Sequence, residues 1–252
     1  MKSLLVIPIT ALLLGSSFCT AEELPLAGIP SELSENASGR SVKVVEAHIN
    51  LAPFTAVRSD VVATIRYIPS DRHRIEAQGP ERIISAIEAR VDKGVLHITS
   101  KGKLRMRRGE RLVLTVYGRE LSTVRIDGVG SFKCSETVNA DRLEIVNSGV
   151  GNINFDDIQC NDLIVKNEGV GNITLKGATT TATYMSDGVG SIYAYDLLSH
   201  DTTVNLNGVG SVQCHASERC EYTNNGVGNI LYKGRPEVQR IHKNGVGNIS
   251  AR

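Results

Sequence analysis

The pentapeptide Gly169-Val170-Gly171-Asn172-Ile173 is one of seven copies of the pattern Gly-Val-Gly-polar-apolar in this chain. The copies begin at Gly128, Gly149, Gly169, Gly188, Gly208, Gly226 and Gly245, so subtraction gives steps of 21, 20, 19, 20, 18 and 19 residues. Periods of this size are typical of stacked structural repeats. The repeat therefore predicts a solenoid.

Three positions in each copy form apolar columns along the stack. Four residues before the first glycine are Val124, Ile145, Val165, Tyr184, Val204, Tyr222 and Ile241. Four residues after it are Phe132, Ile153, Ile173, Ile192, Val212, Ile230 and Ile249. Six residues after it are Cys134, Phe155, Leu175, Ala194, Cys214 and Tyr232. The two later columns alternate with polar positions, which predicts strands with one buried face.

Both glycines of each copy are expected at a corner of the coil. The valine between them has the opposite parity to the apolar positions that follow it, so the backbone must bend at the second glycine. Glycine tolerates positive φ and has no Cβ to crowd the neighbouring layer. The predicted corner residues are Gly128, Gly130, Gly149, Gly151, Gly169, Gly171, Gly188, Gly190, Gly208, Gly210, Gly226, Gly228, Gly245 and Gly247.

The predicted fold is all-β, a parallel β-helix with coils of about 20 residues. A β-propeller fits less well, because its blades need about 40 residues each. We expect one domain over residues 42–252, with irregular coils at 42–126 and regular coils at 127–252. Strand-like segments in the irregular part are residues 42–45, 54–57, 61–68, 83–91, 95–99, 112–117 and 121–126. Residues 83–91 also have helical propensity, but the flanking strands favour β structure.

The N-terminus predicts export. Residues 4–14 are apolar but too short to span a bilayer, and Cys19-Thr20-Ala21 provides a small-x-small cleavage site, so residues 1–21 are predicted to be a signal peptide. Residues 22–41 are rich in Pro and Ser and predict a flexible leader. Cys19 leaves lipoprotein anchoring as the alternative. The expected location is the periplasm, the outer membrane surface or the extracellular space. No later apolar run is long enough to cross a membrane.

The composition argues against nucleic acid as a partner, because 28 basic and 27 acidic residues nearly balance. Trp is absent and aromatic residues make up 4% of the chain, which is low for an enzyme with a carbohydrate cleft.

Several segments together resemble the putative auto-transporter adhesin, head GIN domain family. They are Phe54-x-x-Val57, Asp92-Lys93-Gly94-Val95-Leu96-His97-Ile98, Leu112-x-Leu114-x-Val116, Leu121-x-x-Val124 and the repeated Gly-Val-Gly-Asn-Ile. The resemblance covers roughly residues 45–252. It implies a secreted β-helix similar to that of pectin lyases but without their catalytic residues, and a role in adhesion. It transfers no functional residues, because the family has no agreed site.

An unbroken polar column stands immediately before the repeat glycines: Asp127, Ser148, Glu168, Asp187, Asn207, Asn225 and Asn244. Glu168 and Asp187 lie in adjacent coils, at a spacing that suits a retaining glycosidase or a bridging Ca²⁺. We favour turn hydrogen bonds over metal binding and catalysis, because Asn, Asp and Ser satisfy turns and stack into ladders. No cofactor is expected, and zinc ligand spacing is absent.

Three further features are candidates for function. Tyr193 and Tyr195, with Lys176, His215 and Lys233 along the stack, are the best carbohydrate-like surface, although exposed tyrosines are also common on strands. A basic run of Lys101, Lys103, Arg105, Arg107, Arg108 and Arg111 would suit an anionic glycan or a lipid headgroup, although a solvated hairpin is favoured. Cys214 and Cys220 are either a disulfide or two buried thiols.

The sequence favours a non-enzymatic cell-surface or envelope protein that binds a glycan or a protein through the β-helix face. The alternatives are a polysaccharide-active enzyme of the pectin-lyase kind and a self-assembling structural protein. The seventh repeat is as regular as the internal ones, so its coil is expected to expose unpaired backbone groups. We therefore expect this coil to dock on another copy or a partner, unless residues 42–126 fold back to protect it.

Overall fold

The computed structural model of the protein describes residues 44–252. The predicted signal peptide, the predicted leader and Cys19 lie outside the described residues. The irregular part contains β1 (Val44–Asn50), β2 (Ala56–Ser59), β3 (Val62–Pro69), β4 (Arg74–Pro80), α1 (Glu81–Ile84), β5 (Ile87–Asp92), β6 (Val95–Ser100), β7 (Val113–Gly118) and β8 (Thr123–Ile126). The regular part contains β9 (Val129–Cys134), β10 (Val138–Asn147), β11 (Val150–Asn167), β12 (Ile173–Ser186), β13 (Ile192–Leu206), β14 (Val212–His215), β15 (Arg219–Asn224), β16 (Ile230–Lys233), β17 (Val238–Lys243) and β18 (Ile249–Ala251).

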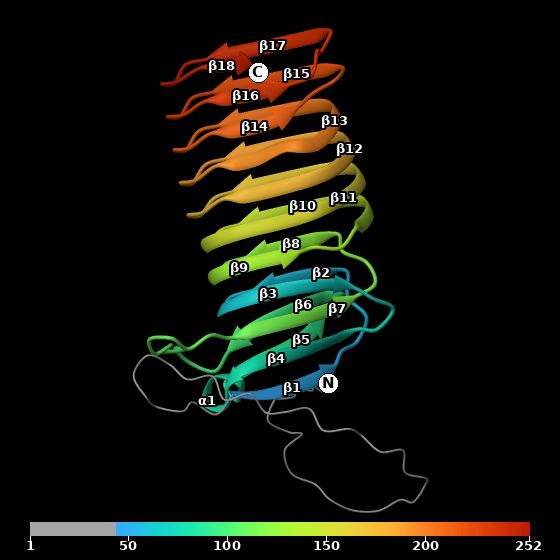
Figure 1. Cartoon of the computed structure of the whole chain (residues 1–252), viewed down its shortest axis with the longest axis vertical. Coiled ribbons are helices and arrows are strands. Elements are labelled where there is room, and N and C mark those ends of the chain that lie inside the picture. Colours follow the sequence, from blue (N-terminus) through green and yellow to red (C-terminus); the bar gives the residue numbers. More distant parts are fainter. Residues whose placement is uncertain (1–43) are drawn as a thin grey trace, which may run out of the picture.

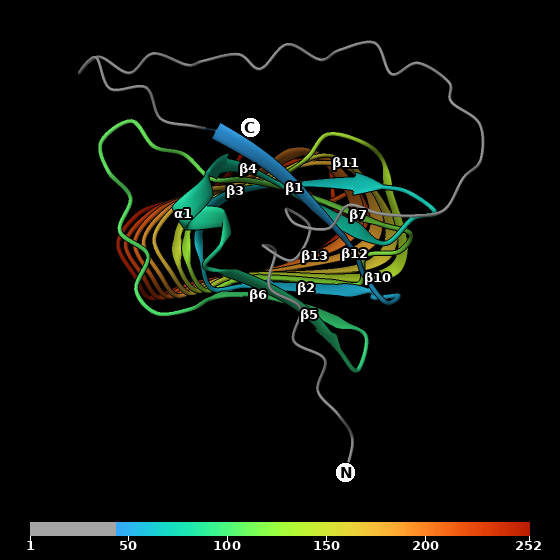
Figure 2. The same cartoon turned by 90° about the horizontal axis from the view of Figure 1, so that it is seen from below.

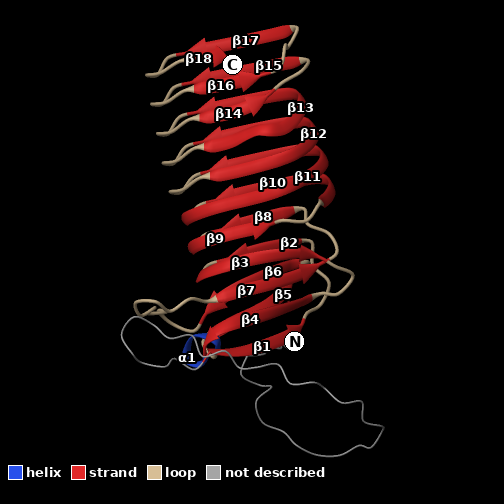
Figure 3. Ribbon diagram, viewed as in Figure 1, coloured by secondary structure: helices blue, strands red, loops and turns tan. Residues whose placement is uncertain are grey.

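The strands wind into a β-solenoid of about 6 turns with about 20 residues per coil, which confirms the predicted fold (Figure 1 and Figure 3). Each coil pairs in parallel with the next, one repeat later in the sequence. Ile153 lies beside Ile173, Ile173 beside Ile192, and Ile192 beside Val212. The repeat period is therefore the period of the main-chain ladder.

The three predicted apolar columns fill the interior. Their side chains are buried in every coil except the last, where Ile241 is 43% exposed and Ile249 is partly exposed. The aromatic rings of Tyr67, Phe132 and Phe155 follow one another along the core, with ring centroids 6.5 and 5.4 Å apart. The last coil is exposed because no further layer of the described residues packs on it.

The irregular part closes the opposite end of the solenoid. Its coils are not stacked in sequence order, because β2 pairs with both β6 and β8, and β3 pairs with both β7 and β9. Below them, β4 runs antiparallel to β1 and β7, and β5 runs antiparallel to β6. The expectation that these residues protect the last repeat is wrong, since they lie at the other end (Figure 1).

Two local expectations need correction. The segment predicted as β structure at 83–91 begins inside α1, whose Ile83 and Ile84 turn into the core, and only its later part forms β5. Strand β4 was not anticipated, because its Glu76, Gln78 and Gly79 obscure the alternation of buried Ile75 and Ala77.

Candidate functional site

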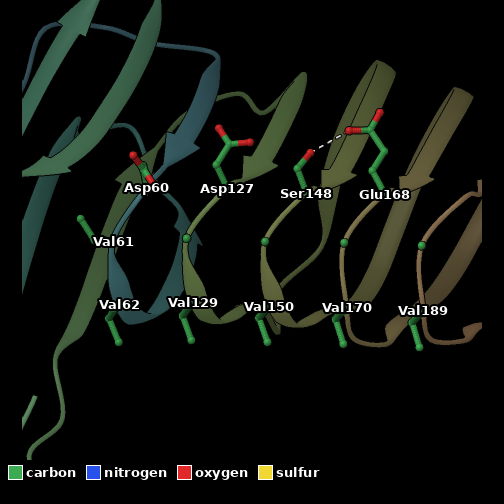
Figure 4. A pocket seen from close by; sticks show the side chains of 14 residues that line it. Asp60, Val61, Val62, Asp127, Val129, Ser148, Val150, Glu168, Val170 and Val189 are labelled. Atoms are coloured by element: carbon green, nitrogen blue, oxygen red, sulfur yellow. Dashed lines mark hydrogen bonds between the residues drawn. The ribbon is translucent and has the colours of Figure 1, made fainter. Parts of the chain in front are cut away.

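A stripe of valines runs along the glycine corners, and we call it the valine stripe. It consists of Val62, Val129, Val150, Val170, Val189, Val209, Val227 and Val246, which pair in register from coil to coil. The six central valines are 47–51% exposed, and Val246 is 69% exposed. Figure 4 shows the side chains from Val62 to Val189 projecting in one direction from successive coils. The valines have the opposite parity to the buried apolar positions that follow them, so they form an apolar row on the surface.

The glycines on either side keep other side chains out of the stripe. The second glycine of each corner has a φ between 129° and 151°, a region that favours glycine. A Cβ on Gly171 would lie 1.8 Å from the carbonyl oxygen of Gly151 in the coil below. The coils can stack at this corner only because both flanking positions lack a side chain.

The polar column before the glycines forms a hydrogen-bonded ladder over most of its length. Ser148 donates its hydroxyl to Glu168 at 2.8 Å. Farther along the stack, Asn207 donates to Asp187 at 2.7 Å and Asn225 donates to Asn207 at 3.0 Å. Asn244 continues the ladder by donating to Asn225 at 3.0 Å.

A second ladder follows the valines, at the polar position of the repeated pentapeptide. The side-chain oxygen of Asn152 accepts the backbone N–H of Asn172 at 2.9 Å, and that of Asn172 accepts the N–H of Ser191 at 2.9 Å. The same bond recurs from Ser211 to Ser191 at 3.0 Å and from Asn248 to Asn229 at 2.8 Å. The restriction of this position to Asn and Ser therefore has a structural cause, the need for an acceptor on a short side chain.

Sequence reasoning missed a third polar column, which is buried two residues before the first glycine. Asn147, Asn167, Ser186 and Asn224 are all fully buried there. Asn147 donates to Asn167 at 2.9 Å, and Asn167 donates to the carbonyl of Gly171 at 3.0 Å. Asn167 and, in the same way, Asn224 therefore tie the strand before a corner to the backbone just after it. Repeated Asn at a position of inward parity was the available signal.

The valine stripe and the outer polar column line a groove of about 540 Å³, which Figure 4 shows from close by. Asp60, Asp127, Ser148 and Glu168 lie along one side, and Val62 to Val189 along the other. Arg58 and Arg125 donate to the carboxylate of Asp127 at 2.7 and 2.8 Å, so this charge is compensated. The groove therefore offers an extended apolar edge beside a polar edge, on which the carboxylates of Asp127 and Glu168 lie near arginines.

The suggested pair of Glu168 and Asp187 does not form a metal cluster. Glu168 accepts from Ser148 and lies 3.7 Å from Arg125, whereas Asp187 accepts from Asn207 in the following coil. Among residues 44–252, no group of three or more His, Cys, Asp or Glu side chains is arranged to hold a metal ion. The two carboxylates act as members of the ladder.

The structure brings only part of the predicted tyrosine surface together. Tyr193 is 39% exposed, but the ring of Tyr195 is covered by the ammonium of Lys233 at 4.7 Å and the guanidinium of Arg252 at 5.7 Å. His215 lies beside Lys233 in register. Lys176 is exposed in the neighbouring coil, opposite Asp196. Only Tyr193 therefore offers a free aromatic face for stacking on a sugar.

The disulfide alternative for Cys214 and Cys220 is not realised, because all four cysteines of the described residues are free and buried. Cys214 lies on β14 and Cys220 on β15, so they belong to different faces of the coil. Burial raises the pKa of the Cys214 thiol to about 12. Burial also raises the pKa of Tyr222, with a further contribution from the nearby Cys214. These groups pack as neutral core side chains.

Known protein families and structures agree with the resemblance noted in the sequence. Residues 53–236 match the model of the putative auto-transporter adhesin, head GIN domain family. The chain belongs to this family. A crystal structure of a putative adhesin from Bacteroides fragilis is similar, with a TM-score of 0.81, 28% sequence identity, and coverage of 83% of this chain and 97% of that chain. No curated protein matches the chain.

Two other similar crystal structures support the fold alone. A putative lipid binding protein from Parabacteroides distasonis has a TM-score of 0.64 and 22% identity, covering 82% of this chain and 96% of that chain. A putative adhesin from Parabacteroides merdae has a TM-score of 0.58 and 21% identity, with the same two coverages. The family and the name of the Bacteroides fragilis structure indicate adhesion by a cell-surface or exported protein. In the part of the chain that the structure describes, no helix is long and apolar enough to cross a membrane.

Proposed function

We propose that the protein is a non-enzymatic, exported adhesion protein that binds a glycan or another surface protein along the valine stripe. The observation that carries the proposal is the stripe itself, eight valines in register over about 34 Å at the strand spacing of a sheet. Large exposed apolar patches rimmed by polar groups are typical of interaction sites. Here the two ladders supply the rim on both sides.

The regularity of the stripe favours a partner that runs along several coils. Covering the exposed half of one valine stabilises a complex by about 1 kcal/mol, which is too little for specific binding by a single coil. Contacts repeated over many coils add up, and the amide ladders offer hydrogen bonds at the same interval. An extended glycan or a strand-like protein segment has the matching shape.

The experiment incubates the protein with a panel of bacterial and host polysaccharides and surface proteins, and measures both retention and new reducing ends. Val170, Val189 and Val209 are replaced together by Thr, which keeps the β-branched shape but adds a hydroxyl to each exposed side chain. Leu198→Thr is the matched control, because Leu198 is 55% exposed and lies outside the stripe.

Retention that is lost in the triple variant and kept in the control supports the proposal. Retention that survives the triple variant contradicts the assignment to the stripe, and its loss in Tyr193→Ala would move the contact to the tyrosine. New reducing ends would contradict a non-enzymatic role and favour the polysaccharide-active alternative. If nothing is retained and the protein forms polymers instead, the self-assembling alternative replaces adhesion.

A further inference from the structure

A basic loop projects sideways from the solenoid near its capped end. Residues 101–112 connect the end of β6 to the start of β7, and Figure 2 shows the loop in green beside α1, seen from that end. We call residues 101–111 the basic loop. It leaves the stack at the place where the regular coils make a tight glycine corner. The six basic side chains of the run in the sequence are therefore displayed at one end of the molecule.

The loop is attached so that its cations face solvent. Leu104 and Met106 are partly buried and pack against the hydrophobic core. Lys103, Arg105 and Arg107 alternate with them and are exposed. This alternation of apolar and basic residues anchors one side of the loop and points the other side outward.

The single acid of the loop is already used. Glu110 forms an ion pair with Arg82 and accepts the backbone N–H of Arg107 at 2.7 Å. Burial acts to raise the pKa of Glu110, but the Arg107 amide and the Arg82 guanidinium outweigh it and hold that pKa below its ordinary value. The carboxylate therefore stays charged and holds the loop together.

Four cations of the loop remain uncompensated. Lys101 lies 3.7 Å from Glu88 and the charge of Arg107 acts on Glu110, but within residues 44–252 the structure gives no ion pair to the other four cations, which are Lys103, Arg105, Arg108 and Arg111. Two nearby acids have other partners, since Glu76 lies 2.9 Å from Arg74 and Glu46 accepts from Gln78 at 3.1 Å. The capped end therefore presents a concentrated positive charge on a chain that is nearly neutral overall.

We propose that the basic loop binds the phosphate groups of an anionic lipid surface and so turns the capped end of the solenoid toward a membrane. The position of the charge favours a lipid surface over an anionic polysaccharide. The six loop cations lie within eleven residues at one end of a rod, whereas a polymer bound along the rod would need cations along its length, where the ladders are mostly paired or neutral. Strand β1, the first strand of the described residues, also lies at this end (Figure 1).

Such a contact would leave the valine stripe standing away from the membrane, with its far end outermost. Each Lys or Arg near an anionic surface strengthens binding about fivefold, so several together give measurable and salt-dependent binding. The basic loop and the valine stripe are different surfaces, and membrane binding by the loop does not depend on adhesion by the stripe.

The test measures co-sedimentation with phosphatidylglycerol-containing vesicles and with pure phosphatidylcholine vesicles. The protein is purified with its predicted signal segment, residues 1–21, removed. The loop variant replaces Lys103, Arg105 and Arg108 with Ser. The matched control replaces Arg235, Arg240 and Lys243 with Ser, which removes the same charge from exposed positions at the other end. Thermal midpoints verify that both variants remain folded.

We expect binding to the phosphatidylglycerol vesicles alone, a decrease with added salt, and partition weakened about a hundredfold in the loop variant but little in the control. Equal binding to both vesicle types, or equal binding by the loop variant and the wild type, would overturn the proposal.

Two competitors distinguish other sources of anionic groups. If polygalacturonate displaces the vesicles and itself binds more tightly through the loop, the partner is a polysaccharide and the lipid assignment is wrong. If inorganic phosphate at the same concentration of charge also displaces the vesicles, the loop is a general anion site and the lipid proposal is wrong.

Discussion

The irregular and regular parts of the solenoid build the same corner with different residues. In the regular part every corner is Gly-Val-Gly, whereas Val61-Val62-Ala63 occupies that place in the coil of β2 and β3, where Val62 pairs with Val129 and Ala63 with Gly130. A Cβ on Gly130 would lie 1.9 Å from the carbonyl oxygen of Ala63, so each glycine side chain would point into the coil below. Below Val61 and Ala63 the chain forms the wide basic loop instead of a tight corner. A corner therefore needs glycine because a side chain there would collide with the corner of the coil below. The corner at Val61–Ala63 has no tight corner below it, so it tolerates side chains.

The largest expected effect comes from a charge in the regular core. Ile173→Asp places an unpaired carboxylate between Ile153 and Ile192, where Ile173 is fully buried. The expected loss is several kcal/mol of a total unfolding free energy of about 5–15 kcal/mol. Ile249→Asp, in the same column of the exposed last coil, should cost much less. Chemical denaturation measures both, and equal losses would contradict the assignment of the column to the core.

The second prediction tests the corner rule directly. Gly171→Val should destabilise the protein by about 3 kcal/mol or more, because it combines an unfavourable φ with a collision against Gly151. Val170→Ala should cost under about 1 kcal/mol, since that side chain is half exposed. Ala63→Gly, in the corner that tolerates side chains, should also cost only about 1 kcal/mol. Thermal midpoints rank the three, and a large loss for Ala63→Gly would contradict this difference between the corners.

A smaller effect is expected for the buried amide ladder, which belongs to the regular part. Asn167→Ala removes the acceptor of Asn147 and the donor to Gly171, and leaves the Asn147 amide unpaired. A loss of about 1–3 kcal/mol follows from the unsatisfied buried groups. Asn207→Ala, in the exposed ladder, is the control and should stay within about 1 kcal/mol. If urea denaturation gives the two variants the same midpoint, the buried ladder does not stabilise the corner.

The smallest effect concerns alkaline pH. Burial raises the pKa of the Cys134 and Cys214 thiols to about 12, whereas an unfolded thiol has a pKa near about 8.5. Between these values the unfolded chain loses the protons that the folded chain keeps, so stability falls as the pH rises. Each thiol should contribute a loss of about 1 kcal/mol by about pH 9. Cys214→Ala should reduce the difference in denaturation midpoint between about pH 7 and about pH 9, and an unchanged difference would show that the thiol ionises in the folded protein.

The regular part could be predicted from sequence because one residue type is forced at the same place in every coil. The glycines recur for a steric reason, and the apolar columns follow from them. The coil of β2 and β3 lacks those glycines, so the glycine repeat did not show that β3 lies between β7 and β9. The segment Asp60-Val61-Val62-Ala63 does align with Asp127-Gly128-Val129-Gly130 if other residues are allowed in place of the two glycines.

The candidate site was predictable only in part. The parity of the valines already implied an exposed row, although it was read as a sign of the corner alone. The covering of Tyr195 by Lys233 and Arg252 depends on side chains from later coils, and no local pattern signals it. The buried amide column was hidden because Ile126 and Leu206 occupy the same position in other coils.

The displaced order of the early coils also determines how the molecule can be built. Strands β2 and β3 leave both of their edges open until β6, β7, β8 and β9 exist, so a chain growing from its N-terminus cannot complete a stable layer before about residue 134. After that point each coil needs only the one before it, and assembly proceeds by addition of one layer at a time. The first half of the chain depends on long-range contacts and forms slowly, and each coil of the second half then adds quickly to the coil before it.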